Sequence, residues 1–254
     1  MKRQTWTAVL GLTALCAVLG TASCETEDPA VRPGEASPAL PQDETARAEA
    51  KVKATVRQAE QVLQAPSTQA SRRAAVGQPA PQFALKDLEN NEVKLSDFKG
   101  KVVVLEWFNP GCPFVRLSHT AGSLKGLAKK HAEGGNVVWL AINSGAAGKQ
   151  GHDVDENRAK AREWGIDYPV LRDESGSVGK AYGATNTPHL FVIDAEGVLR
   201  YSGAIDNSPD GEGKSPRGGK LVNYANQALD ELSQGKPVSV PTTKAYGCGV
   251  KYGA

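Results

Sequence analysis

Cys112 is the residue of this chain whose surroundings most clearly favour chemistry. It follows the chain breakers Asn-Pro-Gly at residues 109–111. An apolar run at Val102 to Leu105, three residues before them, predicts a strand buried on both faces. The spacing of apolar residues after Cys112 favours a helix, although Gly122 and Gly126 weaken it. The thiol is therefore expected at a helix N-terminus, where unpaired N–H groups and the helix dipole favour the thiolate. We predict a reactive thiol; a buried structural cysteine is the alternative.

The composition of the 254-residue chain is that of an ordinary soluble domain with extensions. Hydrophobic residues make up 40% and charged residues 23% of the chain, and the formal net charge is +2. This balance gives no reason to expect a nucleic acid partner. The cysteines are Cys16, Cys24, Cys112 and Cys248. They form no pair of closely spaced CxxC units, and the histidines lack ligand spacing, so we predict neither a metal site nor a cofactor.

The N-terminus predicts export. A short basic region precedes an apolar stretch at Ala8 to Leu19, which is too short to span a membrane and typical of a secretory signal, so residues 1–23 are assigned to a signal peptide. Residues 21–24 (Thr-Ala-Ser-Cys) resemble the motif at which bacterial lipoproteins are cleaved and acylated. Cys24 is therefore predicted to carry lipid and to anchor the protein to a membrane, facing the periplasm. Ordinary signal cleavage that leaves a free thiol is the alternative.

Three further regions follow the signal. Residues 24–75 are rich in Pro, Ala and Glu, which predicts a linker that holds the domain off the membrane; a docking helix in its second half is the alternative. Residues 76–236 carry strand and helix patterns and are the predicted folded domain. Residues 237–254 form a C-terminal tail that contains Cys248.

The pattern of the domain predicts an α/β sandwich with a mixed sheet, because strands and helices alternate before a terminal hairpin and helix. The predicted elements after the first buried strand are strands at residues 136–143 and 168–171, helices at 156–164 and 177–183, a hairpin at 189–205, a mobile loop at 207–220 and an amphipathic helix at 221–233. A short hairpin around residues 90–91 precedes them.

Three segments carry motifs in a recognisable order. They begin at Gly77 (GQPAPQFALKD), at Leu95 (LSDFKGK, followed by the valine run and Trp107) and at Thr187 (TPHLFVID). In this order they resemble the thioredoxin superfamily, in the redoxin branch related to alkyl-hydroperoxide reductase and thiol-specific antioxidant proteins. The resemblance implies a thioredoxin-like three-layer sandwich with a mixed central sheet flanked by helices. It also implies a cis bond between Thr187 and Pro188 beside the reactive sulfur, where this segment would present a backbone edge to the substrate; an ordinary proline at a strand start is the alternative. Trp107 is assigned with them to substrate binding, in the core beside the active site.

The departure from the thioredoxin pattern concerns the second cysteine. Thioredoxins carry a local CxxC pair, in which the second thiol resolves the mixed disulfide made by the first. Here Val115 replaces that second cysteine, and the sequence before Cys112 lacks the PxxxTxxC pattern of typical peroxiredoxins. The partner thiol must lie elsewhere, and Cys248 is the one candidate left after export. The tail around it resembles the ending of exported redoxins with a Cys-Pro-Phe-Val site, and we expect glycines 247 and 249 to let its backbone swing.

The chemistry implied by this resemblance is that of a two-cysteine peroxidase. Cys112 would attack a hydroperoxide and become a sulfenic acid, Cys248 would condense with it to a disulfide, and a thioredoxin-like or other thiol reductant would restore both. Two alternatives for Cys248 are a permanent disulfide staple, worth about 4–5 kcal/mol in the entropic model, and no relation to Cys112. Alternatives for the whole protein are a disulfide reductase or isomerase of exported proteins and a non-catalytic binding module.

Two polar residues of the predicted helix after Cys112 are candidates for supporting roles. Arg116, one turn along, is predicted to stabilise the thiolate, with a solvated surface arginine as the alternative. His119 is expected on the surface rather than as a proton shuttle.

Overall fold

The computed structural model describes residues 73–254, which lie within one compact unit. The predicted signal peptide at residues 1–23, the predicted lipidation of Cys24 and all but the last three residues of the predicted linker lie outside the described residues. Within residues 73–254, no helix combines the length and the apolar character needed to cross a membrane.

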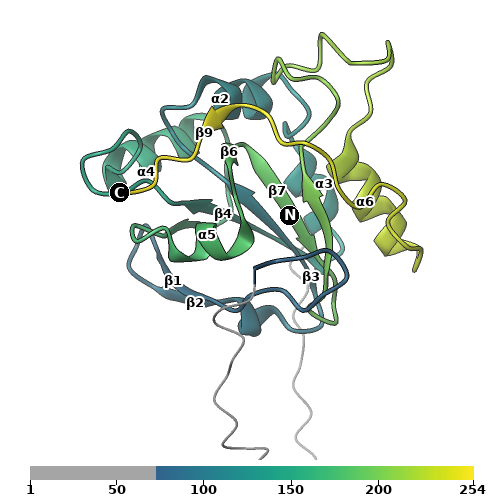
Figure 1. The fold of residues 1–254 in the computed structure, drawn as a ribbon, viewed down its shortest axis with the longest axis horizontal. Helices are drawn as coiled ribbons and strands as arrows, with labels where there is room; N and C mark the ends of the chain where they lie inside the picture. Colours follow the sequence, from purple (N-terminus) through teal and green to yellow (C-terminus); the bar gives the residue numbers. More distant parts are fainter. Residues whose placement is uncertain (1–72) are drawn as a thin grey trace, which may run out of the picture. The chain divides into compact units, whose positions relative to one another are not determined.

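A seven-stranded mixed sheet forms the centre of the fold, as predicted (Figure 1). Its strand order is β2-β1-β5-β4-β3-β7-β8, in which β3, β4 and β5 are parallel and the other pairs are antiparallel. The strands are β1 (Ala84–Asp87), β2 (Glu92–Lys94), β3 (Val102–Trp107), β4 (Val137–Asn143), β5 (Val170–Arg172), β7 (His189–Ile193) and β8 (Leu199–Gly203). The central position of β3 follows from its valine run, because both of its faces are buried.

Helices cover both faces of the sheet. The helical elements are η2 (Leu95–Phe98), α2 (Pro113–Thr120), α3 (Leu127–Ala132), α4 (Val154–Glu163), α5 (Ser177–Tyr182) and α6 (Tyr224–Ser233). Alternate residues of β3 face opposite ways: Leu105 and Trp107 pack in a core with Tyr182 of α5, whereas Val104 packs in a core with α3 and α6. A third core, under α2 and α4, contains Cys112. The three-layer sandwich predicted from the sequence is confirmed.

Two predicted helices differ from the observed ones. The helix after Cys112 ends at Thr120 and a separate helix starts at Leu127, because Gly126 has a left-handed φ of 70° and a side chain at Gly122 would collide with the carbonyl oxygen of Gly211. The last helix starts at Tyr224 rather than at residue 221, because the side chain of Asn223 caps it by accepting from Asn226 N.

The tail contributes a strand that the sequence pattern does not indicate. Strand β9 (Cys248–Gly249) pairs antiparallel with β6 (Asn186–Thr187), and the two form a small separate sheet. In Figure 1 the yellow tail runs from α6 across the molecule to β6. Thr187 and Cys248 are direct partners in this pairing. This register therefore places Cys248 beside Thr187, the residue that precedes Pro188.

Candidate redox site

Cys112 occupies the N-cap position of α2, as predicted. Its backbone is extended (φ −88°, ψ 119°), and Pro113 at the first helical position has the φ that a helix start favours. The thiol is not on an open surface, since Cys112 is only 1% exposed and packs in the core under α2 and α4.

The loop before Cys112 is clamped by side-chain amides. Asn109 Oδ1 accepts a hydrogen bond from Gly111 N at 2.8 Å, and Asn109 Nδ2 donates to the carbonyl oxygen of Gln150 at 3.1 Å. Gln150 Nε2 in turn donates to the carbonyl oxygen of Gly111 at 3.1 Å. The glycine-rich loop after β4, which contains Gln150, thus fixes the loop at residues 109–111 through these two hydrogen bonds.

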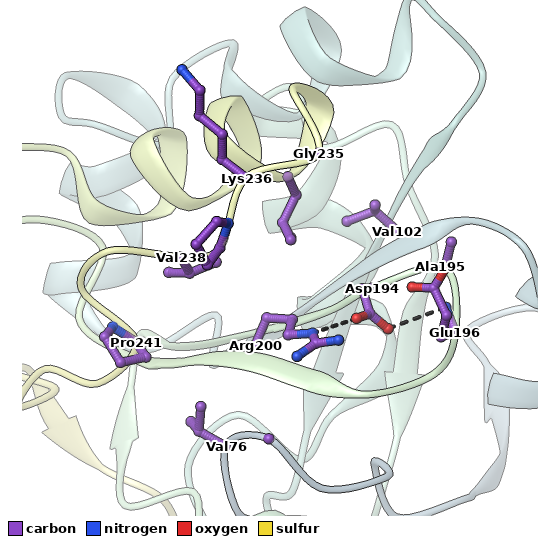
Figure 2. Close-up of a pocket in the computed structure, with 13 residues that line it drawn as sticks. Val76, Val102, Asp194, Ala195, Glu196, Arg200, Gly235, Lys236, Val238 and Pro241 are labelled. Carbon is purple, nitrogen blue, oxygen red and sulfur yellow. Dashed lines mark hydrogen bonds and ion pairs between the residues drawn. The ribbon is translucent and has the colours of Figure 1, made fainter.

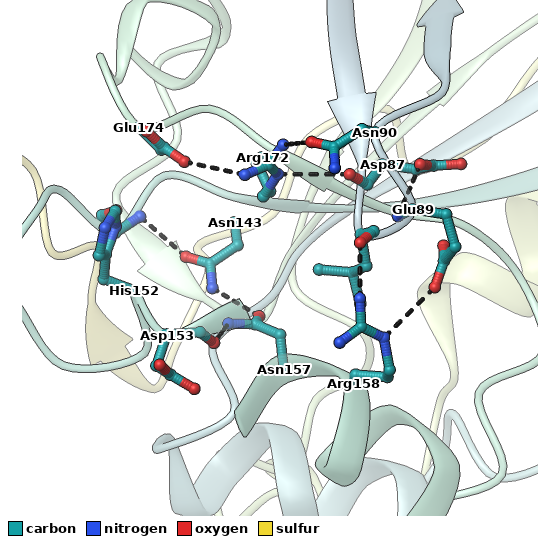
Figure 3. Close-up of polar contacts among 12 residues, drawn as sticks. Asp87, Glu89, Asn90, Asn143, His152, Asp153, Asn157, Arg158, Arg172 and Glu174 are labelled. Atoms are coloured by element: carbon teal, nitrogen blue, oxygen red, sulfur yellow. Dashed lines mark hydrogen bonds and ion pairs between the residues drawn. The ribbon is translucent and has the colours of Figure 1, made fainter. Parts of the chain in front are cut away.

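That second loop is itself fixed by a pair of buried asparagines (Figure 3). Asn143 Nδ2 donates to Asn157 Oδ1 at 2.8 Å, which ties the end of β4 to α4. Both amides also donate to the carbonyl oxygen of Gly151 at 2.7 Å. The clamp around Cys112 therefore rests on regular secondary structure.

The segment at Thr187 lies beside the thiol, as the resemblance implied. The Thr187–Pro188 bond is cis. The Cys112 thiol donates a hydrogen bond to the carbonyl oxygen of Thr187 across 3.0 Å. Thr187 is itself only 1% exposed, so this contact is sealed from solvent.

Cys248 is the second sulfur of the site. It is half-buried, packs against the core that contains Cys112, and both cysteines are free thiols. Burial, a hydrogen bond to Cys112 and the negative charge of an ionised Cys112 raise the pKa of Cys248 to about 11, while Lys251 opposes them. Cys248 therefore keeps its proton at neutral pH and can donate it to the Cys112 sulfur.

The segment that carries Cys248, residues 241–252, is called the strap below. On the N-terminal side of Cys248, Thr243 Oγ1 accepts from Ala204 N at 2.8 Å and shares a hydrogen bond of 2.6 Å with the Tyr201 hydroxyl. Further along, the Tyr246 hydroxyl donates to Asp206 Oδ1 at 2.9 Å. Burial and the nearby charge of Asp206 raise the pKa of Tyr246, so this hydroxyl remains a donor.

The strap is also attached on the C-terminal side of Cys248. Val250 N donates to the carbonyl oxygen of Thr185 at 3.1 Å, and the Tyr252 hydroxyl donates to the carbonyl oxygen of Ala184 at 2.8 Å. Cys248 thus lies between two anchored stretches of chain.

Gly247 corrects our expectation of a swinging backbone. Its φ of 103° is unfavourable for other residues, and a Cβ placed there would lie 2.3 Å from the carbonyl oxygen of Thr187. This glycine is therefore required for close approach of the strap to β6. Gly249, in contrast, has open space around it.

Two predicted site residues, Trp107 and Arg116, differ in exposure. Trp107 is fully buried and its indole donates to Ser144 Oγ at 3.0 Å, so it supports the site from within the core. Arg116 is exposed on α2, and its charge contributes to lowering the pKa of Glu163, although Lys160 has the larger effect. A role for Arg116 at the thiolate stays a prediction.

His119 was expected on the surface, and that expectation is wrong. It is only 6% exposed, and its Nε2 lies 2.7 Å from Oε1 of the fully buried Glu106 on β3. The other oxygen of Glu106 accepts from Trp139 Nε1 at 3.2 Å and from the Tyr168 hydroxyl at 2.9 Å. This network joins α2 to the sheet.

The sequence contains a signal for this network that we did not use. Glu106 interrupts a strand that is otherwise apolar, and a carboxylate in such a place needs buried partners. His119 follows the fully buried Val115 by four residues, so it lies on the same face of the helix.

A cavity of about 520 Å³ lies away from the two sulfurs (Figure 2). It is bordered by the start of β3, the turn between β7 and β8, and the segment after α6. Its most conspicuous charged pair, Arg200 and Asp194, is already joined by an ion pair. Within residues 73–254, no cluster of three or more metal-ligating side chains occurs.

Comparisons with known proteins agree with this geometry. Residues 75–216 match the Redoxin family. The chain is 32% identical to the thiol-disulfide oxidoreductase ResA of Geobacillus thermodenitrificans (strain NG80-2), over 50% of this chain and 67% of that protein. It is 31% identical to Peroxiredoxin-2 of Pongo abelii, over 68% of this chain and 99% of that protein.

Solved structures show the same fold. An uncharacterized conserved protein from Geobacillus kaustophilus superposes with a TM-score of 0.61 at 31% identity, over 70% of this chain and 93% of the other. A hypothetical protein from Sinorhizobium meliloti 1021 superposes with a TM-score of 0.60 at 29% identity, over 72% of this chain and 97% of the other.

Proposed function

The chain belongs to the redoxin family of thiol oxidoreductases, and from that premise we propose that Cys112 and Cys248 are its redox couple. The observation that supports this proposal is the pairing of Thr187 with Cys248 while Thr187 also holds the Cys112 thiol. Two thiols that are far apart in sequence are thereby neighbours in the reduced protein. The couple would interconvert between a dithiol and a disulfide, as a CxxC pair does in a thioredoxin.

We propose a hydroperoxide as the oxidant. The Cys112 thiolate attacks one oxygen of ROOH, the O–O bond breaks, and the alkoxide leaves with a proton as ROH, so that Cys112 becomes a sulfenic acid. The Cys248 sulfur then attacks the Cys112 sulfur, an S–S bond forms, and the sulfenic oxygen leaves as water. An external dithiol reductant supplies the two electrons and two protons that restore both thiols. A small oxidant suits a sulfur that is only 1% exposed.

The raised pKa of Cys248 supports this order of steps. Burial is the largest cause of this raised pKa, and the hydrogen bond to Cys112 and the charge of a Cys112 thiolate add to it. Once Cys112 becomes a neutral sulfenic acid, the negative charge is gone, so Cys248 loses its proton more readily and becomes the nucleophile. The first reaction would therefore remove one of the effects that hold the proton on Cys248, while burial remains.

A second candidate function is the reduction of disulfides in exported proteins. It is favoured by the similarity to ResA, a thiol-disulfide oxidoreductase. Two features argue against disulfide reduction. Val115 stands in place of a local second cysteine, and the strap covers Cys112. A non-catalytic module is the third candidate, and it alone would tolerate Cys112→Ser without loss of function.

The N-terminal sequence supports an exported lipoprotein that faces the periplasm with lipid on Cys24. Mass analysis of the N-terminal peptide from a bacterial membrane fraction tests this proposal. The expected peptide starts at Cys24 and carries acyl chains, and Cys24→Ser releases the protein from the membrane. An unmodified N-terminus at another residue would contradict it.

The test of the redox couple uses the chain from residue 24 with Cys24→Ser, so that Cys112 and Cys248 are its only thiols. After one equivalent of hydrogen peroxide, we expect loss of two hydrogens within seconds and a Cys112–Cys248 linked peptide. In the matched Cys248→Ser variant, the reaction should stop at a sulfenic acid, with a gain of one oxygen. Thiols that stay reduced, or that oxidise only over hours, would remove hydroperoxide as the oxidant.

A further inference from the structure

The backbone beside Cys112 belongs to a strand with one neighbour. Among residues 73–254, strand β6 pairs with β9 alone, and Thr187 in β6 supplies the carbonyl that accepts from the Cys112 thiol. A strand edge of this kind is where proteins bind extended polypeptides, by adding a strand through main-chain hydrogen bonds. Here the strap of the same chain already occupies that position.

We propose that the strap is a built-in strand ligand, which makes the reduced protein react with small oxidants and exclude polypeptide disulfides. This inference rests on the proposed redox couple and adds the class of substrate that it admits. An incoming polypeptide would have to displace β9 before one of its disulfides could reach Cys112, because that sulfur is only 1% exposed. A hydroperoxide needs no strand pairing and much less space.

Strap residues outside β9 also contact the domain near Cys112. Tyr246 packs edge-on against Phe114 of α2, with ring centroids 6.4 Å apart, while its hydroxyl donates to Asp206. Beside these contacts lies a cavity of about 350 Å³, bordered by Asn186, Asp206, Tyr246 and Gly247. Neither cysteine borders this cavity, so it marks open space beside the strap and not a path to Cys112.

Gly247 provides the test, because the approach of the strap to β6 depends on it. A methyl group at this position would lie 2.3 Å from the carbonyl oxygen of Thr187, so Gly247→Ala forces the strap, and Cys248 with it, away from β6 while both cysteines are kept. Gly253→Ala is the matched control. Gly253 lies just beyond the strap, where a Cβ would meet the Cβ of Ala146 at an ordinary 3.4 Å.

The experiment compares two substrates of the reduced protein, again in the Cys24→Ser chain from residue 24. Insulin serves as the polypeptide disulfide, and hydrogen peroxide serves as the small oxidant. With insulin, the dithiol would attack one disulfide through Cys112, and Cys248 would then form the Cys112–Cys248 bond and release two insulin thiols. We expect Gly247→Ala to reduce insulin at least tenfold faster than the parent protein, and Gly253→Ala to match the parent.

One further variant and three contrary outcomes complete the test. Tyr246→Phe, which removes only the hydrogen bond to Asp206, should give a smaller gain with insulin and serves if Gly247→Ala fails to fold. An insulin rate that is unchanged in both strap variants, or a parent protein that reduces insulin as fast as it consumes peroxide, overturns the inference. Absence of the Cys112–Cys248 disulfide after peroxide overturns instead the proposed function on which the inference rests.

Discussion

On one side of the proposed redox couple, Cys112 follows a six-residue strand and starts an eight-residue helix. On the other side, Cys248 lies in a tail whose strand is two residues long. The first segment is held by packing, since Val115 and Phe108 are buried in the core that also encloses Cys112. The second is held mainly by individual hydrogen bonds, such as those of Thr243 and Tyr246.

The difference indicates how each segment responds to change. Packing in a core is cooperative, so damage near Cys112 lowers the stability of the whole domain. A hydrogen bond of the strap contributes about 1 kcal/mol, so its loss loosens one segment and leaves the domain folded. Reactivity can therefore be altered through the strap without loss of the fold.

The largest expected effect comes from breaking the Cys112 side at Glu106. Glu106→Ala leaves His119, Trp139 and Tyr168 without their shared buried acceptor, and we expect a loss of roughly 3–5 kcal/mol in the free energy of unfolding. Urea denaturation measures this loss. Glu106→Gln, which keeps an acceptor oxygen, should lose less, and a Glu106→Ala variant within 1 kcal/mol of the parent would show that the network does not hold α2.

A smaller effect is expected at His189 of β7, which pairs with Trp107 at the end of β3. This side chain should make the free energy of unfolding depend on pH. Burial lowers the pKa of His189 to about 4, so between pH 6.5 and pH 4 the unfolded chain binds a proton that the folded protein does not. Stability contributed by neutral His189 is complete above pH 6.5 and is lost as the pH falls, by roughly 3 kcal/mol in all.

The matched variant for this prediction is His189→Gln. The difference in unfolding free energy between the parent protein and His189→Gln should change across pH 6.5 to 4 in that direction. Parallel pH profiles of the two proteins would rule out the titration of this side chain as a cause of acid sensitivity.

On the strap side, Thr243→Val removes the acceptor of Ala204 N and the partner of the Tyr201 hydroxyl. We expect a cost of about 1–2 kcal/mol that falls mainly on the strap, together with slower formation of the Cys112–Cys248 disulfide. Quenched-flow peptide mapping measures the rate of disulfide formation. Thr242→Val, one residue away, is the control and should leave the rate unchanged. A Thr243→Val variant with parental kinetics would mean that the strap is held elsewhere.

The smallest structural change is Cys112→Ser, which tests the electrostatic link between the sulfurs. It removes the charge and the sulfur hydrogen bond that help to hold the pKa of Cys248 at about 11, while burial remains. The midpoint for alkylation of Cys248 by iodoacetamide should therefore move to lower pH. An unchanged midpoint would show that burial alone sets this pKa.

The Cys112 side could be predicted from the sequence because its signals are local. The valine run, the chain breakers at residues 109–111 and Pro113 occur within about a dozen positions, and they fix the buried strand, the turn and the helix start. The cis bond at Pro188 followed from resemblance to a family and is present in the structure.

The strap could not be predicted because its contacts leave no periodic pattern. Thr243 and Tyr246 bind partners about forty residues earlier in the chain, and the pairing of β9 with β6 involves two residues on each strand. Gly247 looked like a flexible joint because a glycine in sequence does not reveal whether freedom or close approach requires it. His119 was misjudged because a histidine suits the surface and a buried pair equally well.

Asp206 joins three parts of the chain at one residue, through its carboxylate and its backbone. Its Oδ1 accepts from Tyr246 of the strap and from Ser208 N in its own loop at 2.8 Å, and its backbone bridges to Asn223 at the start of α6. Asp206 therefore connects the loop predicted to be mobile, the strap and the N-terminus of α6. We expect native-state fluctuations to open these three segments as one cooperative unit. Their amide protons would then exchange with deuterium at a common rate, well before those of β3 and β4.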